Sequence, residues 1–394
     1  MSAASPDPVG TAAALRQRVE AAIGRRGVLA VDLHAAGEHG RVLLSGVADV
    51  PPLPMLDAMR YLARDRDDLR LRMLREPRGY PAANCNLVLP ASAPEAVAGF
   101  VIMEQVEYPL MSGSNTICVA TALIETGLVP AEEPTTRFVL ETPAGLVAIT
   151  ATVSGGKVRT VTFENAPSFV FDLDVPIEVP GIGRVTVDLA YGGMIYVLAE
   201  AAALGVELSA HNARTLVRVG EALKAATRAQ APRVHPERPD VVGPTIVCLT
   251  GPPSGSHADQ QNAVVVSTGA LEWDRPDTFT GALDRSPCGT ATCARMAVLH
   301  ARGQLGLGEG FRNEGLLGTV FTGRLVAEAA VAGRSGVVPT ITGSAWITGY
   351  HLDVLEETDP FPTGYTLGDL WGANTLARSL NAPGEREDPG RVRP

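Results

Sequence analysis

Two short stretches of the sequence combine residue types that can move a proton beside a bound carboxylate. Ser112–Thr116 and Cys288–Thr292 each begin with a nucleophilic side chain, continue with glycine and then carry hydroxyl side chains. Each opens an apolar stretch with helical spacing, the first ending near Glu125 and the second near Ala301. Because the same pattern occurs twice, we expect two homologous halves that face a single site.

The start of a helix favours specific chemistry. Its first backbone N–H groups are unpaired and carry about half a positive charge, so they bind a carboxylate and favour a thiolate over a thiol. Gly113 and Gly289 let the backbone approach a ligand closely. If a substrate carboxylate is held between the starts of both helices, the α-carbon of that substrate lies between Ser112 and Cys288. We expect a pKa near neutral pH for Cys288, whereas Ser112 needs strong assistance.

Both residues also have a plain structural interpretation. A lone cysteine before glycine is more often a small buried hydrophobe than a base. Ser112 can serve simply as a helix N-cap. The repeat of the pattern at two helix starts favours the chemical interpretation of Cys288, and the other four cysteines are expected to be structural.

Composition narrows the class of protein. The chain has 394 residues, 45% hydrophobic and 19% charged, as in a soluble two-domain enzyme. The net charge is −10 and no Lys/Arg-rich run occurs, so nucleic acid is not an expected partner. Residues 1–26 lack a secretory pattern and no apolar stretch spans a bilayer, so no membrane association is expected. Five cysteines without a C-x-x-C pair favour reduced thiols in a cytoplasmic protein.

Strand patterns outnumber helical ones. Helical spacing occurs at 11–23, 55–67 and 211–230, and β patterns occur at 28–33, 42–44, 86–89, 99–107, 146–152, 158–163, 185–190, 244–250 and 262–267. The glycine pair at 155–156 predicts a hairpin. The mixture predicts an α/β (α+β) fold and disfavours a doubly wound nucleotide fold. Residues 1–26 form an N-terminal extension, and the charged tail 383–394 is expected to be flexible.

Two further motifs have weaker chemical interpretations, and one expected of a nucleotide-binding enzyme is missing. His34 and His39 fit neither one face of a helix nor one face of a strand and have no third ligand, so we expect no metal site. Residues 250–256 are glycine-rich but lack the lysine and spacing of a phosphate-binding loop. No dinucleotide fingerprint follows the first predicted strand, which disfavours a nicotinamide-dependent oxidoreductase.

Taken together, the motifs resemble those of the proline racemase family, which includes proline racemases, 4-hydroxyproline 2-epimerases and trans-3-hydroxy-L-proline dehydratases. Asp284–Thr290, followed by Ala294–Ala297, is similar to the family's second catalytic motif almost letter for letter. Met111–Ile117 is similar to the first motif, Met-Cys-Gly-His, with serine replacing both cysteine and histidine. Supporting stretches lie at 34–38, 41–42, 76–79, 166–170, 191–193, 321–324 and 341–349.

The resemblance implies a fold of the diaminopimelate-epimerase type, in which two pseudo-symmetric lobes each wrap a curved sheet around a central helix. Residues 27–190 would form the lobe carrying Ser112 and residues 191–344 the lobe carrying Cys288, with 345–382 returning to the first lobe. The resemblance also implies that no pyridoxal phosphate, metal or other cofactor is used, and that the protein is a homodimer or a monomer.

Roles at the site follow from the same resemblance. Ser112 and Cys288 would be the acid/base pair, and Asp284 would receive the ring ammonium of an imino acid. The substrate carboxylate would be bound by the residues after that pair, Gly113, Ser114, Gly289 and Thr290. The group that takes the proton from the L-face stays open, because expected pKa favours Cys288 while geometry can assign the step to an activated Ser112.

Serine at position 112 bears on the choice of activity within the family. Inversion needs an effective acid and base on opposite faces, whereas dehydration to Δ1-pyrroline-2-carboxylate needs one good base. We therefore expect a trans-3-hydroxy-L-proline dehydratase, with 4-hydroxyproline 2-epimerase, alone or as a second activity, as the alternative and proline racemase third. The thiol in the Asp284–Thr290 motif disfavours an inactive imino-acid-binding protein, and the proline-family motifs disfavour diaminopimelate epimerase.

Overall fold

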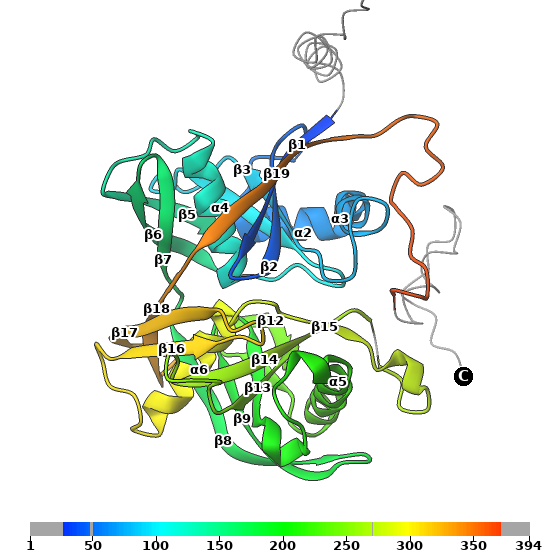
Figure 1. Cartoon of the computed structure of the whole chain (residues 1–394), viewed down its shortest axis with the longest axis vertical. Helices are drawn as coiled ribbons and strands as arrows, with labels where there is room; N and C mark the ends of the chain where they lie inside the picture. The colour runs from blue at the N-terminus through cyan, green and yellow to red at the C-terminus, as the bar shows by residue number, and fades with distance from the viewer. Residues whose placement is uncertain (1–26, 48–49, 270, 372–394) are drawn as a thin grey trace, which may run out of the picture.

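The protein folds into two lobes of strands, one above the other, each built around a buried helix (Figure 1). The computed structural model describes residues 27–47, 50–269 and 271–371. Within these residues, every strand except those of one two-stranded ribbon belongs to a continuous sheet that bends around both lobes. This mixed α/β architecture confirms the predicted fold class.

The first lobe is a curved sheet around α4 (Gly113–Glu125). Its strand order is β19-β1-β2-β3-β4-β5-β6-β7, parallel between β2 and β3 and between β4 and β5, and antiparallel elsewhere. Helices α2 (Met55–Asp65) and α3 (Asp67–Leu74) pack on the opposite face from α4. The strands are β1 (Gly27–Ala35), β2 (Glu38–Ser45), β3 (Cys85–Leu89), β4 (Ala98–Met103), β5 (Thr135–Thr142), β6 (Gly145–Ser154), β7 (Lys157–Glu164) and β19 (Ala345–Val354).

The second lobe wraps around α6 (Gly289–Ala301), with α5 (Ala213–Gln230) on the opposite face of its sheet. Its strand order is β8-β9-β10-β13-β14-β16-β17-β18, parallel between β10 and β13 and between β14 and β16. The strands are β8 (Ser168–Val179), β9 (Gly183–Tyr191), β10 (Ile195–Glu200), β13 (Ile246–Gly251), β14 (Gln260–Ser267), β15 (Gly281–Leu283), β16 (Gly310–Glu314), β17 (Val320–Val331), β18 (Arg334–Gly343) and the ribbon β11 (Arg233–His235) with β12 (Arg238–Gly243).

The two lobes repeat one another strand by strand, since their parallel pairs fall at equivalent places in the two strand orders. Buried carboxylates repeat as well. Glu141 Oε2 accepts the backbone N–H of Ser92 at 2.6 Å, and Glu314 Oε2 accepts that of Ser254 at 2.8 Å. The sequence repeat at residues 112 and 288 is therefore part of a repeat of the whole fold.

Two strands near the C-terminal end connect the lobes. β18 pairs with β17 and β8 in the second lobe and with β7 in the first, where Ile341 lies opposite Phe163. β19 then runs back along β1. Phe163 belongs to the core around α4, whereas Phe169 belongs to the core around α5. The core that the chain packs against therefore changes between β7 and β8, and the division of the chain at residue 190 stays a prediction.

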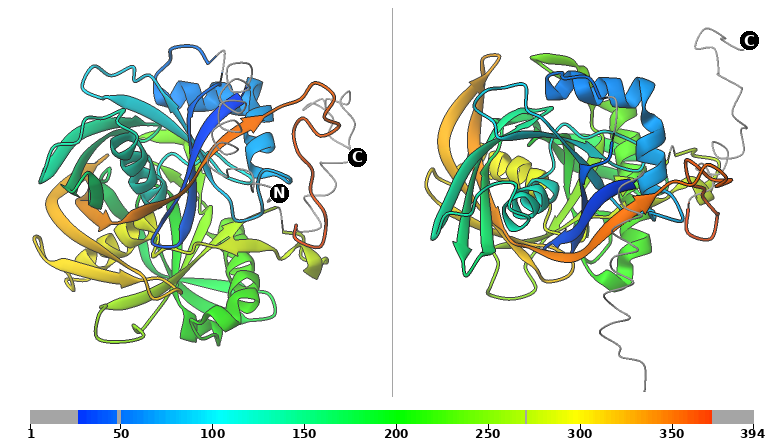
Figure 2. Two further views of the ribbon diagram at one scale, coloured as in Figure 1. Left: turned by 45° about the horizontal axis from the view of Figure 1, so that its top comes forward. Right: turned by 90° about the horizontal axis from the view of Figure 1, so that it is seen from above.

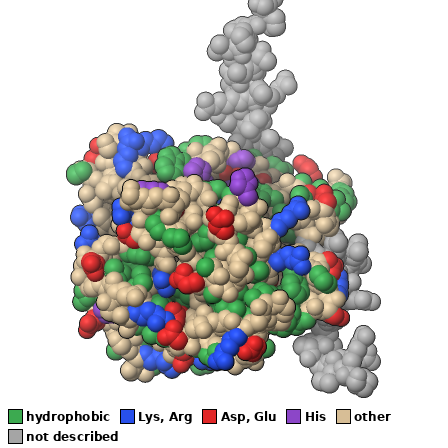
Figure 3. Space-filling model, turned by 60° about the horizontal axis from the view of Figure 1, so that its bottom comes forward, with side chains coloured by type: hydrophobic (Ala, Val, Ile, Leu, Met, Phe, Trp, Pro, Cys, Tyr) green, Lys and Arg blue, Asp and Glu red, His purple; other side chains and the backbone are tan. Residues whose placement is uncertain are grey.

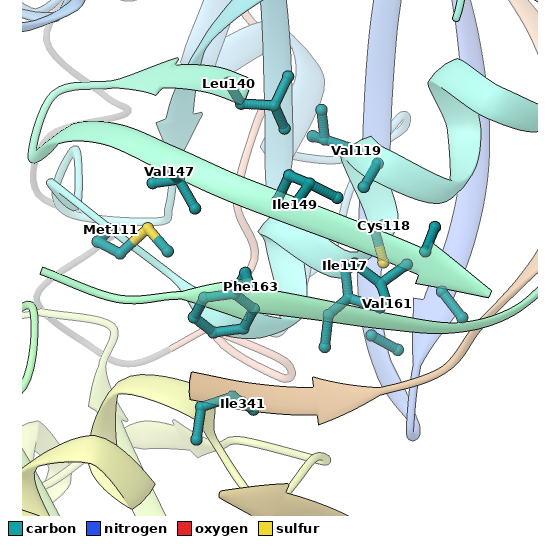
Figure 4. Packing of buried hydrophobic residues seen from close by; sticks show 14 of the residues in the cluster. Met111, Ile117, Cys118, Val119, Leu140, Val147, Ile149, Val161, Phe163 and Ile341 are labelled. Atoms are coloured by element: carbon teal, nitrogen blue, oxygen red, sulfur yellow. The ribbon is translucent and has the colours of Figure 1, made fainter. Parts of the chain in front are cut away.

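Helix α4 is enclosed by strands, as Figure 2 shows from two further directions. Every residue from Gly113 to Ile124 is buried. Figure 4 shows Ile117 beside Val161 and Phe163 of β7, with Ile341 of β18 on the same core. A helix that is apolar all round must be covered on every side, and this packing fixes where the helix begins.

Several predicted elements differ in detail. The helix expected at 55–67 is interrupted at Arg66, whose φ of −136° separates α2 from α3. The strand expected at 99–107 ends at Met103. The helix expected at 11–23 and the tail 383–394 lie outside the described residues.

The described helices and the surface give two further observations. None of the described helices combines the length and apolar character needed to cross a bilayer. On the face shown in Figure 3, acidic and basic side chains are interspersed among apolar and neutral ones.

Candidate active site

The starts of α4 and α6 meet at the junction of the lobes. A Cβ atom added to Gly113 would lie 2.7 Å from the Cα of Gly289, and one added to Gly289 would lie 2.8 Å from the Cα of Gly113. Real Cβ atoms do not approach this closely, so both positions require glycine. The contact brings Ser112 and Cys288, each directly before one of these glycines, to one cavity between the lobes.

Ser112 precedes α4 with an extended backbone, φ −145° and ψ 129°. Its Oγ accepts a hydrogen bond from Asn115 Nδ2 at 3.0 Å and lies 3.3 Å from Ser114 Oγ. The side chain makes no capping hydrogen bond to the helix backbone. The N-cap interpretation is therefore wrong for the Ser112 hydroxyl, which lines the cavity.

Buried amide groups link Ser112 to a carboxyl group. Asn115 Nδ2 also donates to Asn84 Oδ1 at 2.8 Å, and Asn84 Nδ2 donates to Glu38 Oε1 at 2.7 Å. The other oxygen of Glu38, Oε2, accepts the backbone N–H of Arg285 at 2.6 Å. Since Arg285 belongs to the second lobe, this chain of hydrogen bonds crosses the cleft and fixes the orientation of each amide.

Cys288 has an unusual backbone conformation directly before α6. Its φ is +57° and its ψ is 110°, in the left-handed half of backbone space that residues with a side chain seldom occupy. Its N–H donates to Ser286 Oγ at 3.0 Å, and Ser286 Oγ donates to Asp284 Oδ1 at 2.8 Å. Strain of this kind persists only where the surroundings hold it, and it is concentrated at functional sites.

Two hydroxyl groups contact the Cys288 thiol. Tyr196 Oη lies 3.4 Å and Thr290 Oγ1 lies 3.7 Å from Sγ, and the two hydroxyls lie 2.7 Å apart. Burial and the charge of Asp284 raise the pKa of Cys288 well above its ordinary value, while hydrogen bonds from Tyr196, Ala291 and Thr290 oppose the rise. The expected near-neutral pKa is thus wrong for this thiol, because the sequence reveals a helix start but not its burial.

Three acidic side chains line the same cavity, Glu38, Glu104 and Asp284. Burial and the charge of Asp284 raise the pKa of Glu38, and burial raises the pKa of Asp284 against its hydrogen bonds from Ser286. Burial and the charges of Glu107 and Asp284 raise the pKa of Glu104 to about 8. Carboxyl groups held this closely retain protons or attract a cation.

The cavity gathers five of the seven predicted site residues, Ser112, Ser114, Asp284, Cys288 and Thr290. Gly113 and Gly289 lie behind them in the helix contact. Sequence reasoning missed seven other lining residues with polar side chains, Glu38, Asn84, Glu104, Gln105, Asn115, Tyr196 and Ser267. Asn115 lies inside the first motif and Glu38 ends the supporting stretch 34–38, so these two polar side chains were the available signal.

The remaining candidate motifs have structural roles. His39 Nε2 lies 3.6 Å from Asp32 Oδ2, and His34 stacks on Trp346 with ring centroids 5.2 Å apart. No cluster of three or more potential metal ligands occurs in the part of the chain that the structure describes. In the glycine-rich loop at 250–256, Ser254 anchors the backbone to Glu314.

Comparison with known proteins identifies the family, since the proline racemase family model matches residues 30–366. The chain belongs to the proline racemase family. One family relative, "4-hydroxyproline 2-epimerase 1" of Rhizobium rhizogenes (strain K84 / ATCC BAA-868), is 38% identical over 350 residues, 88% of this chain and 97% of the relative.

Two solved structures of proline racemase family relatives match over most of their length. A probable proline racemase from Agrobacterium radiobacter K84 with bound carbonate has a TM-score of 0.81 and 38% identity, covering 88% of this chain and 99% of that one. A hydroxyproline epimerase from Agrobacterium vitis with bound trans-4-OH-L-proline has a TM-score of 0.81 and 37% identity, covering 89% and 98%.

Proposed function

We propose that this chain is a 4-hydroxyproline 2-epimerase. The observation that carries the proposal is the cavity lined by Ser112 from one helix start and Cys288 from the other. Inversion at an α-carbon needs a proton-exchanging group on each face. The substrate is supported by the 38% identical relative named 4-hydroxyproline 2-epimerase 1 and by the relative solved with trans-4-OH-L-proline. These comparisons favour the epimerase over the dehydratase expected from Ser112.

In this proposal the two charged ends of the imino acid bind to different groups. The carboxylate lies between the starts of α4 and α6, where the backbone N–H groups and the hydroxyls of Ser114 and Thr290 can donate to it. The ring ammonium lies beside Asp284 and Glu38, whose pKa values are raised while no cation balances them. Both ends together hold the α-carbon between Ser112 and Cys288.

In this proposal the proton transfers use Ser112 and Cys288. Burial and the charge of Asp284 raise the pKa of Cys288. An ammonium beside Asp284 cancels the second of these contributions, and the helix start and the Tyr196 and Thr290 hydroxyls then stabilise the thiolate. For the L epimer, the thiolate takes the α-proton and the C–H electron pair delocalises into the carboxylate, where the N–H groups stabilise it. Ser112 Oγ delivers a proton to the opposite face, and in the reverse direction the two groups exchange roles.

Optical rotation of trans-4-hydroxy-L-proline incubated with the purified protein tests the proposal. An epimerase drives the rotation towards that of an epimer mixture. The dehydratase activity stays a prediction, tested in parallel by trapping Δ1-pyrroline-2-carboxylate formed from trans-3-hydroxy-L-proline. Constant rotation with trapped imine would exclude the epimerase and establish the dehydratase.

A further inference from the structure

Glu104 is an acidic group of the cavity that the proton transfers do not use. It follows the last residue of β4 and lines the cavity together with Ser112 and Cys288. Among the described residues its carboxyl group makes no hydrogen bond or ion pair. Burial raises its pKa to about 8, with further contributions from the charges of Glu107 and Asp284. The group therefore keeps its proton at neutral pH and can both donate and accept a hydrogen bond.

The backbone of Glu104 is held firmly although its side chain is not. The Glu104 carbonyl accepts a hydrogen bond from Arg70 Nη1 at 3.1 Å, and its N–H donates to the Glu107 carbonyl at 2.9 Å. Arg70 is itself fixed by Asp67 through two hydrogen bonds of 2.6 Å and 2.7 Å. The carboxyl group thus extends from an anchored point on the wall of the first lobe.

The other polar side chains outside the acid/base and carboxylate sites have partners. Gln105 Nε2 donates to the carbonyls of Leu74 and Tyr80, and Ser267 Oγ donates to Glu221 Oε1 at 2.8 Å. The apolar part of the wall consists of Pro81, Ala82, Ala83, Met111, Met194, Ile246, Val266, Ala282 and Leu283. Of the three carboxyl groups that line the cavity, Glu38 and Asp284 accept hydrogen bonds from described residues and Glu104 does not, so Glu104 is available to a polar substituent on a ring.

We propose that Glu104 recognises the ring hydroxyl of the substrate and so separates hydroxyproline from proline; this rests on the proposed function. The ring nitrogen of an imino acid is part of the ring itself. Glu104 and Asp284, the residue assigned to the ring nitrogen, line the same cavity. A ring held by its nitrogen at Asp284 therefore lies in the cavity that the Glu104 carboxyl lines. An unpaired carboxyl in an apolar wall gains a hydrogen bond from hydroxyproline and none from proline.

The test compares two substrates in two variants. In Glu104→Leu, we expect kcat/KM for α-proton exchange of trans-4-hydroxy-L-proline to fall about tenfold or more relative to that of L-proline. Glu104→Gln keeps a donor and an acceptor and should restore most of the preference. The exposed Glu95→Leu serves as the matched control and should leave both values unchanged.

The outcomes are distinct. An equal loss for both substrates in Glu104→Leu would overturn the proposal and assign Glu104 to the ammonium or to general positioning, and an unchanged ratio would also overturn it. If the wild-type protein exchanges neither substrate, the proposed function fails. In that case, the rise in melting temperature caused by each amino acid tests whether Glu104 recognises the ring hydroxyl, independently of catalysis. Loss of the extra stabilisation by hydroxyproline in Glu104→Leu supports the proposal, and its retention contradicts it.

Discussion

The Cα atoms of Gly113 and Gly289 lie against each other where α4 and α6 begin, and neither position has room for a side chain. Each glycine directly follows a residue that lines the cavity, so this contact sets how closely Ser112 and Cys288 approach a substrate. Groups that act on opposite faces of one carbon must be positioned with precision, because small displacements reduce the reaction rate strongly. The helix contact is therefore part of the site.

Gly113→Ala tests this contact. The added methyl group forces the helix starts apart, so we expect the epimerisation rate to fall at least tenfold and the free energy of unfolding to fall by about 1–3 kcal/mol. Gly310→Ala is the matched control, because a Cβ there meets nothing within 4 Å. Wild-type turnover in Gly113→Ala would contradict the role given to the contact.

Cys288→Ala removes the thiol from the second half-site. We expect α-proton exchange of trans-4-hydroxy-L-proline with deuterated water to be lost, since Ser112 has no partner of comparable acidity on the other face. Mass spectrometry of the recovered amino acid measures the exchange. Cys293→Ala, a buried cysteine in the same helix, controls for the loss of a sulfur atom and should keep its activity. Full exchange in Cys288→Ala would remove this residue as an acid/base group.

Tyr196→Phe removes a hydroxyl that lies 3.4 Å from Cys288 Sγ. Its hydrogen bond lowers the pKa of Cys288, against the larger effect of burial. Without it the pKa of the thiol rises, and the base form appears only at higher pH. We therefore expect the acidic limb of the pH profile of kcat/KM to move to higher pH, while Tyr191→Phe leaves it in place. An unchanged profile in Tyr196→Phe would show that this hydroxyl does not act on the thiol.

Glu141→Gln and Glu314→Gln test the repeated carboxylates. Although burial opposes it, hydrogen bonds from the serine loops lower the pKa of both groups. A carboxyl with a lowered folded pKa stabilises the fold above the unfolded value of about 4.3 and loses that contribution as pH falls through the folded value. We expect each variant to lose about 1–3 kcal/mol at pH 7, with a smaller difference in acid.

Thermal unfolding of Glu141→Gln, Glu314→Gln and the wild type between pH 3 and 7 measures these differences in stability. Glu95→Gln, an exposed carboxyl on the first lobe, serves as the control and should match the wild type. If the difference between Glu141→Gln and the wild type stays constant down to pH 3, the stabilisation does not depend on ionisation of this group.

The sequence predicted the parts of the fold and site that depend on local pattern. Ser112 and Cys288 precede α4 and α6 as the glycine and hydroxyl pattern indicated. Tyr196 could not be predicted in this way, because it reaches the thiol from β10 and belongs to no motif. Glu38 and Asn84 likewise join the site through long-range hydrogen bonds. The pKa of Cys288 was misjudged because burial depends on both lobes.

The central claim is that two groups serve opposite faces of one carbon, and solvent deuterium tests it most directly. When trans-4-hydroxy-L-proline is converted in deuterated water, the group that removes the proton differs from the group that supplies the deuteron. Early in the reaction the inverted product should therefore carry α-deuterium, while the remaining L epimer still carries protium. Deuterium in the unconverted L epimer without any inverted product would show that one group acts on one face, and would contradict the account.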